Sequence, residues 1–164
     1  MKKHMETKIV RTGPGKILGV KIKNVWSWQG IPYAKPPVGE LRFRRAQPPE
    51  PWENTYWATK QKANCPQANM KLKQDEDCLS LNIWVPDKGA RKKPVLFYVH
   101  GGSFCSGSGN EAKYNGGKLA ASRDVIVVTF NYRLGALGFL DFSYLNESFE
   151  ANCGLSDVLA ALRW

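Results

Sequence analysis

The sequence predicts an α/β protein built around a mostly parallel sheet. Two apolar runs lead to this prediction, residues 95–99 (VLFYV) and 125–130 (VIVVTF). Strands that read as nearly continuous apolar runs are typical of a sheet covered on both faces. Between the runs, two glycines precede a weakly helical segment at residues 118–122. The order strand, loop, helix, strand predicts a βαβ unit with a right-handed crossover.

The N-terminal part is expected to add a β-hairpin to that sheet. Residues 7–11 and 16–22 are short β-prone runs, and Gly13-Pro14-Gly15 lies between them as a turn. Residues 25–34 follow and lead into the paired prolines Pro36-Pro37. Because proline excludes helix and restricts the residue before it, we expect an extended path from there to Trp52.

Three further elements complete the predicted order. Residues 79–85 first alternate apolar and polar side chains and then read Ile-Trp-Val, which predicts a strand. Residues 87–93 form the turn to the strand at 95–99. A last helix is expected near the C-terminus, capped by Ser156, with Asp157 in its first turn. Its apolar face would comprise Leu155, Leu159 and Leu162.

Composition limits the class of protein. The chain has 164 residues, of which 43% are hydrophobic and 12% aromatic, which favours a packed domain over disorder. No apolar run is long enough to span a membrane. The basic N-terminus is not followed by the apolar segment of a signal peptide, so a cytoplasmic location is expected. The net charge of +10 comes from scattered lysines and arginines, and we therefore expect no nucleic-acid partner.

The cysteines do not have the spacing of metal ligands. There are four, and the sequence has only two histidines to accompany them, so no metal and no cofactor are expected. Cys65 and Cys78 could close a short loop in an oxidising compartment, and the sequence leaves their redox state open.

The end of the run at 95–99 is the candidate for chemistry. It stops at His100-Gly101-Gly102, and a loop of small residues follows. Glycine lets the backbone turn sharply and leaves N–H groups accessible. Two adjacent N–H groups aimed at one point can bind the negative oxygen that develops when an acyl carbonyl is attacked. The structural alternative is a glycine turn that only leaves a core strand.

Five segments resemble type-B carboxylesterases, the carboxylesterase and cholinesterase family. In chain order they are GIPYAKPPVGELRF at 30–43, EDCLSLN at 76–82, HGGSF at 100–104, NYRLG at 131–135 and GLSD at 154–157. They follow the family's order and cover nearly the whole chain. The resemblance implies the α/β-hydrolase fold, with residues 1–164 as the incomplete N-terminal portion of one domain.

The resemblance also implies roles in the loop at residues 100–104. The N–H groups of Gly102 and Ser103 would donate to the oxyanion, and Gly101 would permit the turn. Many family members have glycine where this chain has Ser103, but the donor is the backbone N–H group. His100 is expected to orient the loop rather than act as a base. Phe104 and Tyr114 could line the substrate pocket, although core packing is the expected role of Phe104. Gly107 and Gly109 are expected to keep the loop tight rather than contact ligand.

Three structural links follow from positions within the family motifs: Arg42 with Glu76, Arg133 with Asp157, and Cys65 with Cys78. The ion pairs would each tie a loop or a helix to the sheet. The two cysteines match a disulfide of secreted relatives, but without a signal peptide their thiols can stay reduced. The short segment between them disfavours choline esters as substrates.

The catalytic triad of the family is expected beyond Trp164. In this fold the nucleophile lies in a G-x-S-x-G elbow, followed along the chain by the acid and the histidine. The sequence contains no such pentapeptide. The last helix stops at Arg163-Trp164 without a capping glycine or a proline, so we expect the chain to be truncated there.

The resulting hypothesis is a serine carboxylesterase acting on a small-molecule carboxylic ester. Residues 1–164 would carry its oxyanion-hole loop but not its triad, and this fragment alone is predicted to be inactive because a serine without a base is a poor nucleophile. The alternative is a non-catalytic cholinesterase-like binding or adhesion domain. A downstream elbow with or without serine would separate the two.

Overall fold

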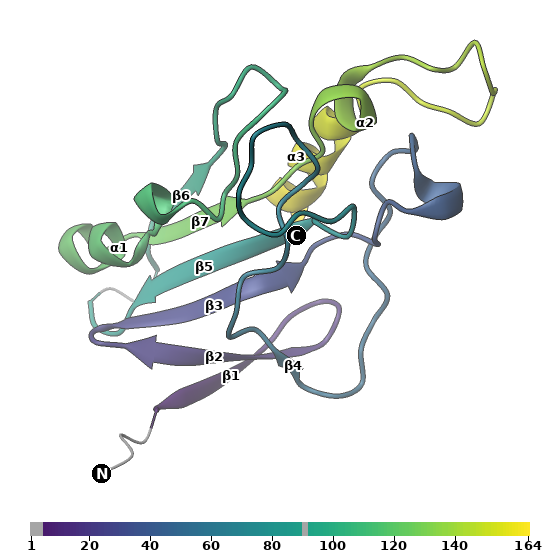
Figure 1. Ribbon diagram of the computed structural model, residues 1–164. Coiled ribbons are helices and arrows are strands. Elements are labelled where there is room, and N and C mark those ends of the chain that lie inside the picture. The colour runs from purple at the N-terminus through teal and green to yellow at the C-terminus, as the bar shows by residue number, and fades with distance from the viewer. Residues whose placement is uncertain (1–4, 90–91) are drawn as a thin grey trace.

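The computed structural model describes residues 5–89 and 92–164 and shows a single mixed sheet with helices on both faces (Figure 1). The strands are β1 (Thr7–Arg11), β2 (Lys16–Ile22), β3 (Val25–Pro32), β4 (Tyr56–Trp57), β5 (Ser80–Pro86), β6 (Val95–Tyr98) and β7 (Ile126–Phe130). The α-helices are α1 (Gly117–Arg123), α2 (Gly135–Phe139) and α3 (Cys153–Arg163), and two 3-10 turns lie at Gly39–Leu41 and Ala112–Tyr114. His4 and part of the turn predicted at 87–93 lie outside the described residues.

The sheet confirms the predicted α/β class and the predicted βαβ unit. Its strand order is β1-β2-β3-β5-β7-β6, with β4 beside β2. β6 and β7 run parallel and are connected through α1. Four successive pairs, from β1–β2 to β5–β7, are antiparallel, so this part of the sheet is mostly antiparallel rather than mostly parallel. Short turns between β1, β2 and β3 force antiparallel pairing, because parallel pairs need a long crossover.

The N-terminal hairpin forms where it was predicted. Thr7 pairs with Val20 and Arg11 with Lys16, and the Thr12 N–H group closes the turn on the Gly15 carbonyl. β3 is a full strand, although the sequence indicated only an extended path toward the prolines. Its pairing with β5 shifts register between Trp28 and Ile31.

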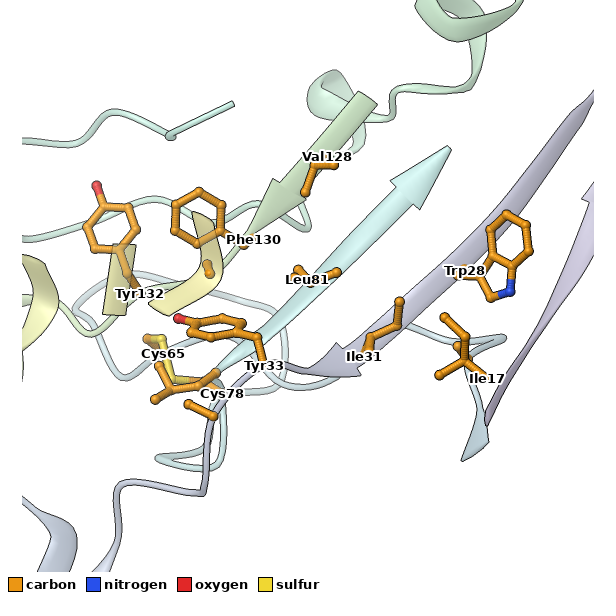
Figure 2. Packing of buried hydrophobic residues seen from close by; sticks show 14 of the residues in the cluster. Ile17, Trp28, Ile31, Tyr33, Cys65, Cys78, Leu81, Val128, Phe130 and Tyr132 are labelled. Carbon is orange, nitrogen blue, oxygen red and sulfur yellow. A yellow bond between two sulfur atoms is a disulfide. The ribbon is translucent and has the colours of Figure 1, made fainter. Parts of the chain in front are cut away.

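Successive side chains along a strand point to opposite faces of the sheet, and each face carries an apolar cluster. On one face, Trp84 and Val127 pack with Ala120 of α1. The other face carries the larger cluster, which Figure 2 shows running across the sheet from Trp28 to Tyr132. Ala161 of α3 belongs to that second cluster. The helices α1 and α3 therefore cover opposite faces of the sheet.

The prediction that residues 95–99 are buried on both faces is wrong. β6 is the last strand of the described sheet, and its outer edge has no partner strand within residues 5–89 and 92–164. The exposed fractions of Val95, Leu96 and Val99 are 58%, 40% and 46%. An apolar run predicts that both faces of a strand are buried, but it does not identify the segment that buries them.

The start and the buried face of α3 also differ from the prediction. The helix begins at Cys153 after Asn152, which has a φ of 56°, so Ser156 lies in the first turn instead of capping it. The Ser156 hydroxyl donates to the Cys153 carbonyl at 2.7 Å and accepts from the Ala46 N–H group at 3.0 Å. The three leucines predicted to face the core are exposed instead: Leu155, Leu159 and Leu162. The helix packs through its small and charged side, namely Cys153, Gly154, Asp157 and Ala161.

None of the helices in the described part of the chain has the length and apolarity to cross a membrane.

Candidate functional site

The candidate site is the loop that leaves the end of β6 and leads to α1 (Figure 1). Gly101, Gly102 and Ser103 lie together in this loop and are exposed. The N–H groups of Cys105 and Ser106 both donate to the Gly102 carbonyl at 3.0 Å, which closes a tight turn. In the described residues, the N–H groups of Gly102 and Ser103 have no acceptor. Two consecutive donors are therefore open to a ligand.

Backbone geometry shows where this turn needs glycine. Gly102 has a φ of 127°, and a Cβ atom there would lie 1.9 Å from the Ser106 carbonyl oxygen. Ser103 and Phe104 follow with φ values of 51° and 61°, in the left-handed region that few side chains adopt. At Gly101, in contrast, an added Cβ would meet no atom within 4 Å. The turn thus depends on Gly102, and position 101 has room for a methyl group.

His100 anchors the first residue of the loop. Its side chain is buried and stacks on the Tyr132 ring with a centroid distance of 4.3 Å. The Tyr132 hydroxyl donates to the His100 carbonyl at 2.7 Å, and His100 Nδ1 lies 3.0 Å from the Gly101 carbonyl oxygen. A carbonyl can only accept, so Nδ1 carries the proton. Burial lowers the pKa of His100, which favours this neutral form.

The lowered pKa of His100 predicts a loss of stability in acid. Below the ordinary histidine pKa of about 6.5, the unfolded chain binds a proton that the folded chain resists, so the free energy of unfolding decreases as pH falls. Thermal unfolding of the full-length protein between about pH 7 and pH 5 should show this decrease, and His100→Gln should make it shallower. Equal slopes in the parent and His100→Gln would contradict the assignment.

Phe104 does not pack in the core, contrary to the expectation from sequence. Its exposed fraction is 62%, and its ring lies against Phe139 of α2 at a centroid distance of 4.7 Å. The left-handed turn before it directs the side chain outward. Its carbonyl accepts a hydrogen bond from the Gly135 N–H group at 2.7 Å, which ties the loop to α2.

Gly107 and Gly109 do keep the loop tight, as predicted. A Cβ atom at Gly107 would lie 2.3 Å from the Gly101 carbonyl oxygen, and one at Gly109 would lie 2.4 Å from the Phe130 carbonyl oxygen. The second half of the loop is therefore pressed against both its own first half and β7.

A buried network of amides and hydroxyls holds this second half, and sequence reasoning missed it. Asn131 Oδ1 accepts from the Gly109 N–H group and from the Ser108 hydroxyl, both at 2.9 Å. Asn64 Oδ1, from the segment before the disulfide, also lies within hydrogen-bonding distance of this hydroxyl, which can donate its single proton to only one of the two amide oxygens at a time. Gln67 pairs with both backbone groups of Gly107. The one signal in the sequence is that Asn131 opens the NYRLG segment.

Three links inferred from the family resemblance are present in the structure. Arg133 donates to both oxygens of Asp157, from Nε at 2.8 Å and from Nη2 at 2.7 Å, with both side chains buried. Arg42 makes a similar two-point contact with Glu76 at 2.7 and 2.8 Å, where solvent reaches both side chains. The disulfide between Cys65 and Cys78, which the sequence left open, is formed. Burial raises the pKa of Asp157, and the hydrogen bonds from Arg133 oppose that shift.

Comparison with known proteins agrees with this architecture. The model of the "Carboxylesterase family" matches residues 6–164. The chain is 47% identical to para-nitrobenzyl esterase of Bacillus subtilis (strain 168) over 168 residues, covering 98% of this chain and 34% of that protein. It is 44% identical to juvenile hormone esterase of Tribolium castaneum over 144 residues, covering 84% of this chain and 24% of that protein.

Solved structures give the same result. A structure of PNB esterase superposes with a TM-score of 0.92 at 48% identity, over 96% of this chain and 33% of that one. A carboxylesterase of Geobacillus stearothermophilus superposes with a TM-score of 0.87 at 42% identity, over 95% of this chain and 33% of that one. The chain thus spans about a third of the length of these relatives. With its fold, its ion pairs and its matched residues in agreement, it belongs to the carboxylesterase family.

Proposed function

We propose that the full-length protein is a serine carboxylesterase that hydrolyses small carboxylic esters, and that residues 1–164 supply its oxyanion hole. The observation that carries this proposal is the pair of open N–H donors at Gly102 and Ser103. They lie in a loop that is anchored at His100, Phe104 and Gly107. Rigid donors of this kind stabilise developing charge without having to reorganise during the reaction.

The chemistry assigns one task to this part of the chain. A serine hydroxyl attacks the ester carbonyl carbon, its proton passes to a base, and the carbonyl electron pair moves onto oxygen as the tetrahedral intermediate forms. The N–H groups of Gly102 and Ser103 donate to that oxygen. The Ser103 side chain lies next to the donors and narrows the space for the acyl group. We place the serine, its acidic partner and its histidine in the part of the protein beyond Trp164.

The cytoplasmic location stays a prediction. The Cys65–Cys78 disulfide, in contrast, is more typical of an oxidising compartment.

Steady-state hydrolysis of p-nitrophenyl acetate and p-nitrophenyl butyrate tests the proposal. The full-length protein should show saturable turnover that a serine-directed phosphonate abolishes. Absence of turnover from a folded full-length protein would instead indicate a non-catalytic relative.

The isolated chain of 164 residues should show no saturable turnover in the same assay. It contains no G-x-S-x-G elbow, and His100 Nε2, the nitrogen left free to act as a base, is buried without a partner among the described residues. Saturable hydrolysis that is lost on Ser106→Ala would show that the chain carries its own nucleophile and would contradict this prediction.

A further inference from the structure

A glutamine from a different loop pairs with both backbone groups of one residue in the candidate oxyanion loop. Gln67 Oε1 accepts from the Gly107 N–H group at 2.7 Å, and Gln67 Nε2 donates to the Gly107 carbonyl at 2.8 Å. A carboxamide holds one donor group and one acceptor in the same plane. Two short hydrogen bonds to one residue therefore fix the position and the orientation of Gly107.

Gly107 is in direct contact with the start of the same loop. A Cβ atom on it would lie 2.3 Å from the Gly101 carbonyl oxygen and 2.6 Å from His100 Nδ1. The carbonyl of the preceding residue, Ser106, is as close to Gly102, where an added Cβ would lie 1.9 Å from it. Residues 106 and 107 thus form the support against which the two open donors rest, and a displacement of Gly107 reaches Gly102 without passing through the rest of the sheet.

Gln67 is itself held in place. It lies inside the loop closed by the Cys65–Cys78 disulfide, and its Nε2 atom also donates to the Cys65 carbonyl at 3.1 Å. Its N–H group donates to Gln74 Oε1 at 2.6 Å, across the same loop. Figure 1 shows the segment that contains this loop, between β4 and β5, lying beside the loop that follows β6. Gln67 is thus held within its own loop by one side-chain and one backbone hydrogen bond, and a residue held in this way can restrain a partner in turn.

We propose that Gln67 is a positioning residue for ester hydrolysis, which sets the placement of the Gly102 and Ser103 donors by holding Gly107. This inference rests on the proposed function. Gln67 touches neither substrate nor the reacting atoms, so its effect should appear in the transition state and not in substrate binding. Loss of the two hydrogen bonds between Gln67 and Gly107 should lower kcat and leave KM nearly unchanged. The reason is that the donors bind the carbonyl oxygen strongly only after it has become charged in the transition state.

The test compares Gln67→Ala, Gln67→Glu and Gln61→Ala in the full-length protein. Gln67→Glu keeps the length and the acceptor but loses the donor to the Gly107 carbonyl. Gln61→Ala is the matched control, because it removes an exposed glutamine from the segment just before the disulfide loop that hydrogen-bonds to neither Gln67 nor residues 100–109. Active sites are counted by a phosphonate burst so that kcat is expressed per functional site. A trifluoromethyl ketone serves as the probe of oxyanion stabilisation.

Both Gln67 variants should lower kcat on the order of tenfold, since small displacements of catalytic groups have large effects on rate. KM should change by less than about twofold, and the trifluoromethyl ketone should bind more weakly by the same factor as kcat falls. Gln61→Ala should keep kcat within about twofold of the parent. The proposal is overturned if the kcat of Gln67→Ala stays at the parental value, or if Gln61→Ala loses as much.

Hydrogen exchange keeps the inference testable independently of turnover. Exchange of the peptide covering residues 101–109 should accelerate in Gln67→Ala and not in Gln61→Ala. If the parent itself hydrolyses no ester, the proposed function fails, whereas accelerated exchange would still support the link from Gln67 to the loop. Unchanged exchange in Gln67→Ala would overturn that link.

Discussion

The full-length protein with Gly102→Ala should keep its fold and lose ester hydrolysis by a factor on the order of a hundred to a thousand, the usual effect of losing one oxyanion donor. The new Cβ atom would lie 1.9 Å from the Ser106 carbonyl oxygen, at a residue whose φ is 127°. Neither backbone can yield without moving the N–H groups of Gly102 and Ser103. The measurement is kcat/KM for p-nitrophenyl butyrate, with circular dichroism and thermal unfolding to verify the fold.

Gly101→Ala is the matched control for that experiment. The two glycines are adjacent and equally accessible, but a Cβ atom on Gly101 meets nothing within 4 Å. We expect kcat/KM of this variant to stay close to that of the parent. Similar losses in both variants would mean that the loop needs glycine for flexibility and not for the placement of donors. Full activity in Gly102→Ala would refute the oxyanion assignment.

Asp157→Asn should lower the free energy of unfolding by about 3–5 kcal/mol, which is typical when one partner of a buried ion pair is removed. Arg133 is 3% exposed, and a guanidinium cannot lose its proton to escape the penalty. Its Nη1 atom has no hydrogen-bond partner within the described residues, and the Cys153 carbonyl, 3.5 Å from Nη2, is too distant an acceptor to replace the carboxylate. The pair connects the segment after β7 to α3, and its loss should weaken the packing of α3 against the sheet.

Urea unfolding of the full-length protein measures this effect, and Glu76→Gln provides the comparison. Glu76 contacts Arg42 with the same two-point geometry, but both side chains are partly exposed. Water can replace the lost contact there, so the urea midpoint of Glu76→Gln should shift much less than that of Asp157→Asn. A shift for Glu76→Gln as large as that for Asp157→Asn would show that burial does not set the strength of these pairs.

Local patterns in the sequence predicted the elements whose neighbours are close in the chain. The hairpin of β1 and β2 was found from a turn between two β-prone runs, and β7 from its β-branched residues. α3 was found, but its buried face was not. Three leucines at helical spacing indicated a core face, whereas the helix packs through Asp157 and small residues around an ion pair. Sequence spacing shows that a face is apolar and not which segment covers it.

The candidate site was likewise predictable only in part: the position of the loop could be predicted, but not the residues that support it. The loop at residues 100–104 was singled out because a glycine run at the end of an apolar strand lets the backbone turn and exposes its N–H groups. The choice of Gly102 and Ser103 as donors came from the family resemblance and stays a prediction. The residues that support the loop could not be located, because Gln67 is far from it in sequence and follows no periodicity. Amides of this kind become meaningful only when folding places them against a particular backbone group.

The uncovered side of β6 has a consequence for how such a protein is made. In a protein with the length of the relatives, this N-terminal third leaves the ribosome first. The outer edge of β6 then stays unpaired until later parts of the chain have been synthesised. At translation rates of about 5–20 residues per second, the delay is on the order of tens of seconds. Throughout that time Val95, Leu96 and Val99 present an apolar edge on which a neighbouring nascent chain can pair. The yield of active protein in a cell should therefore depend on chaperones that bind nascent chains during translation.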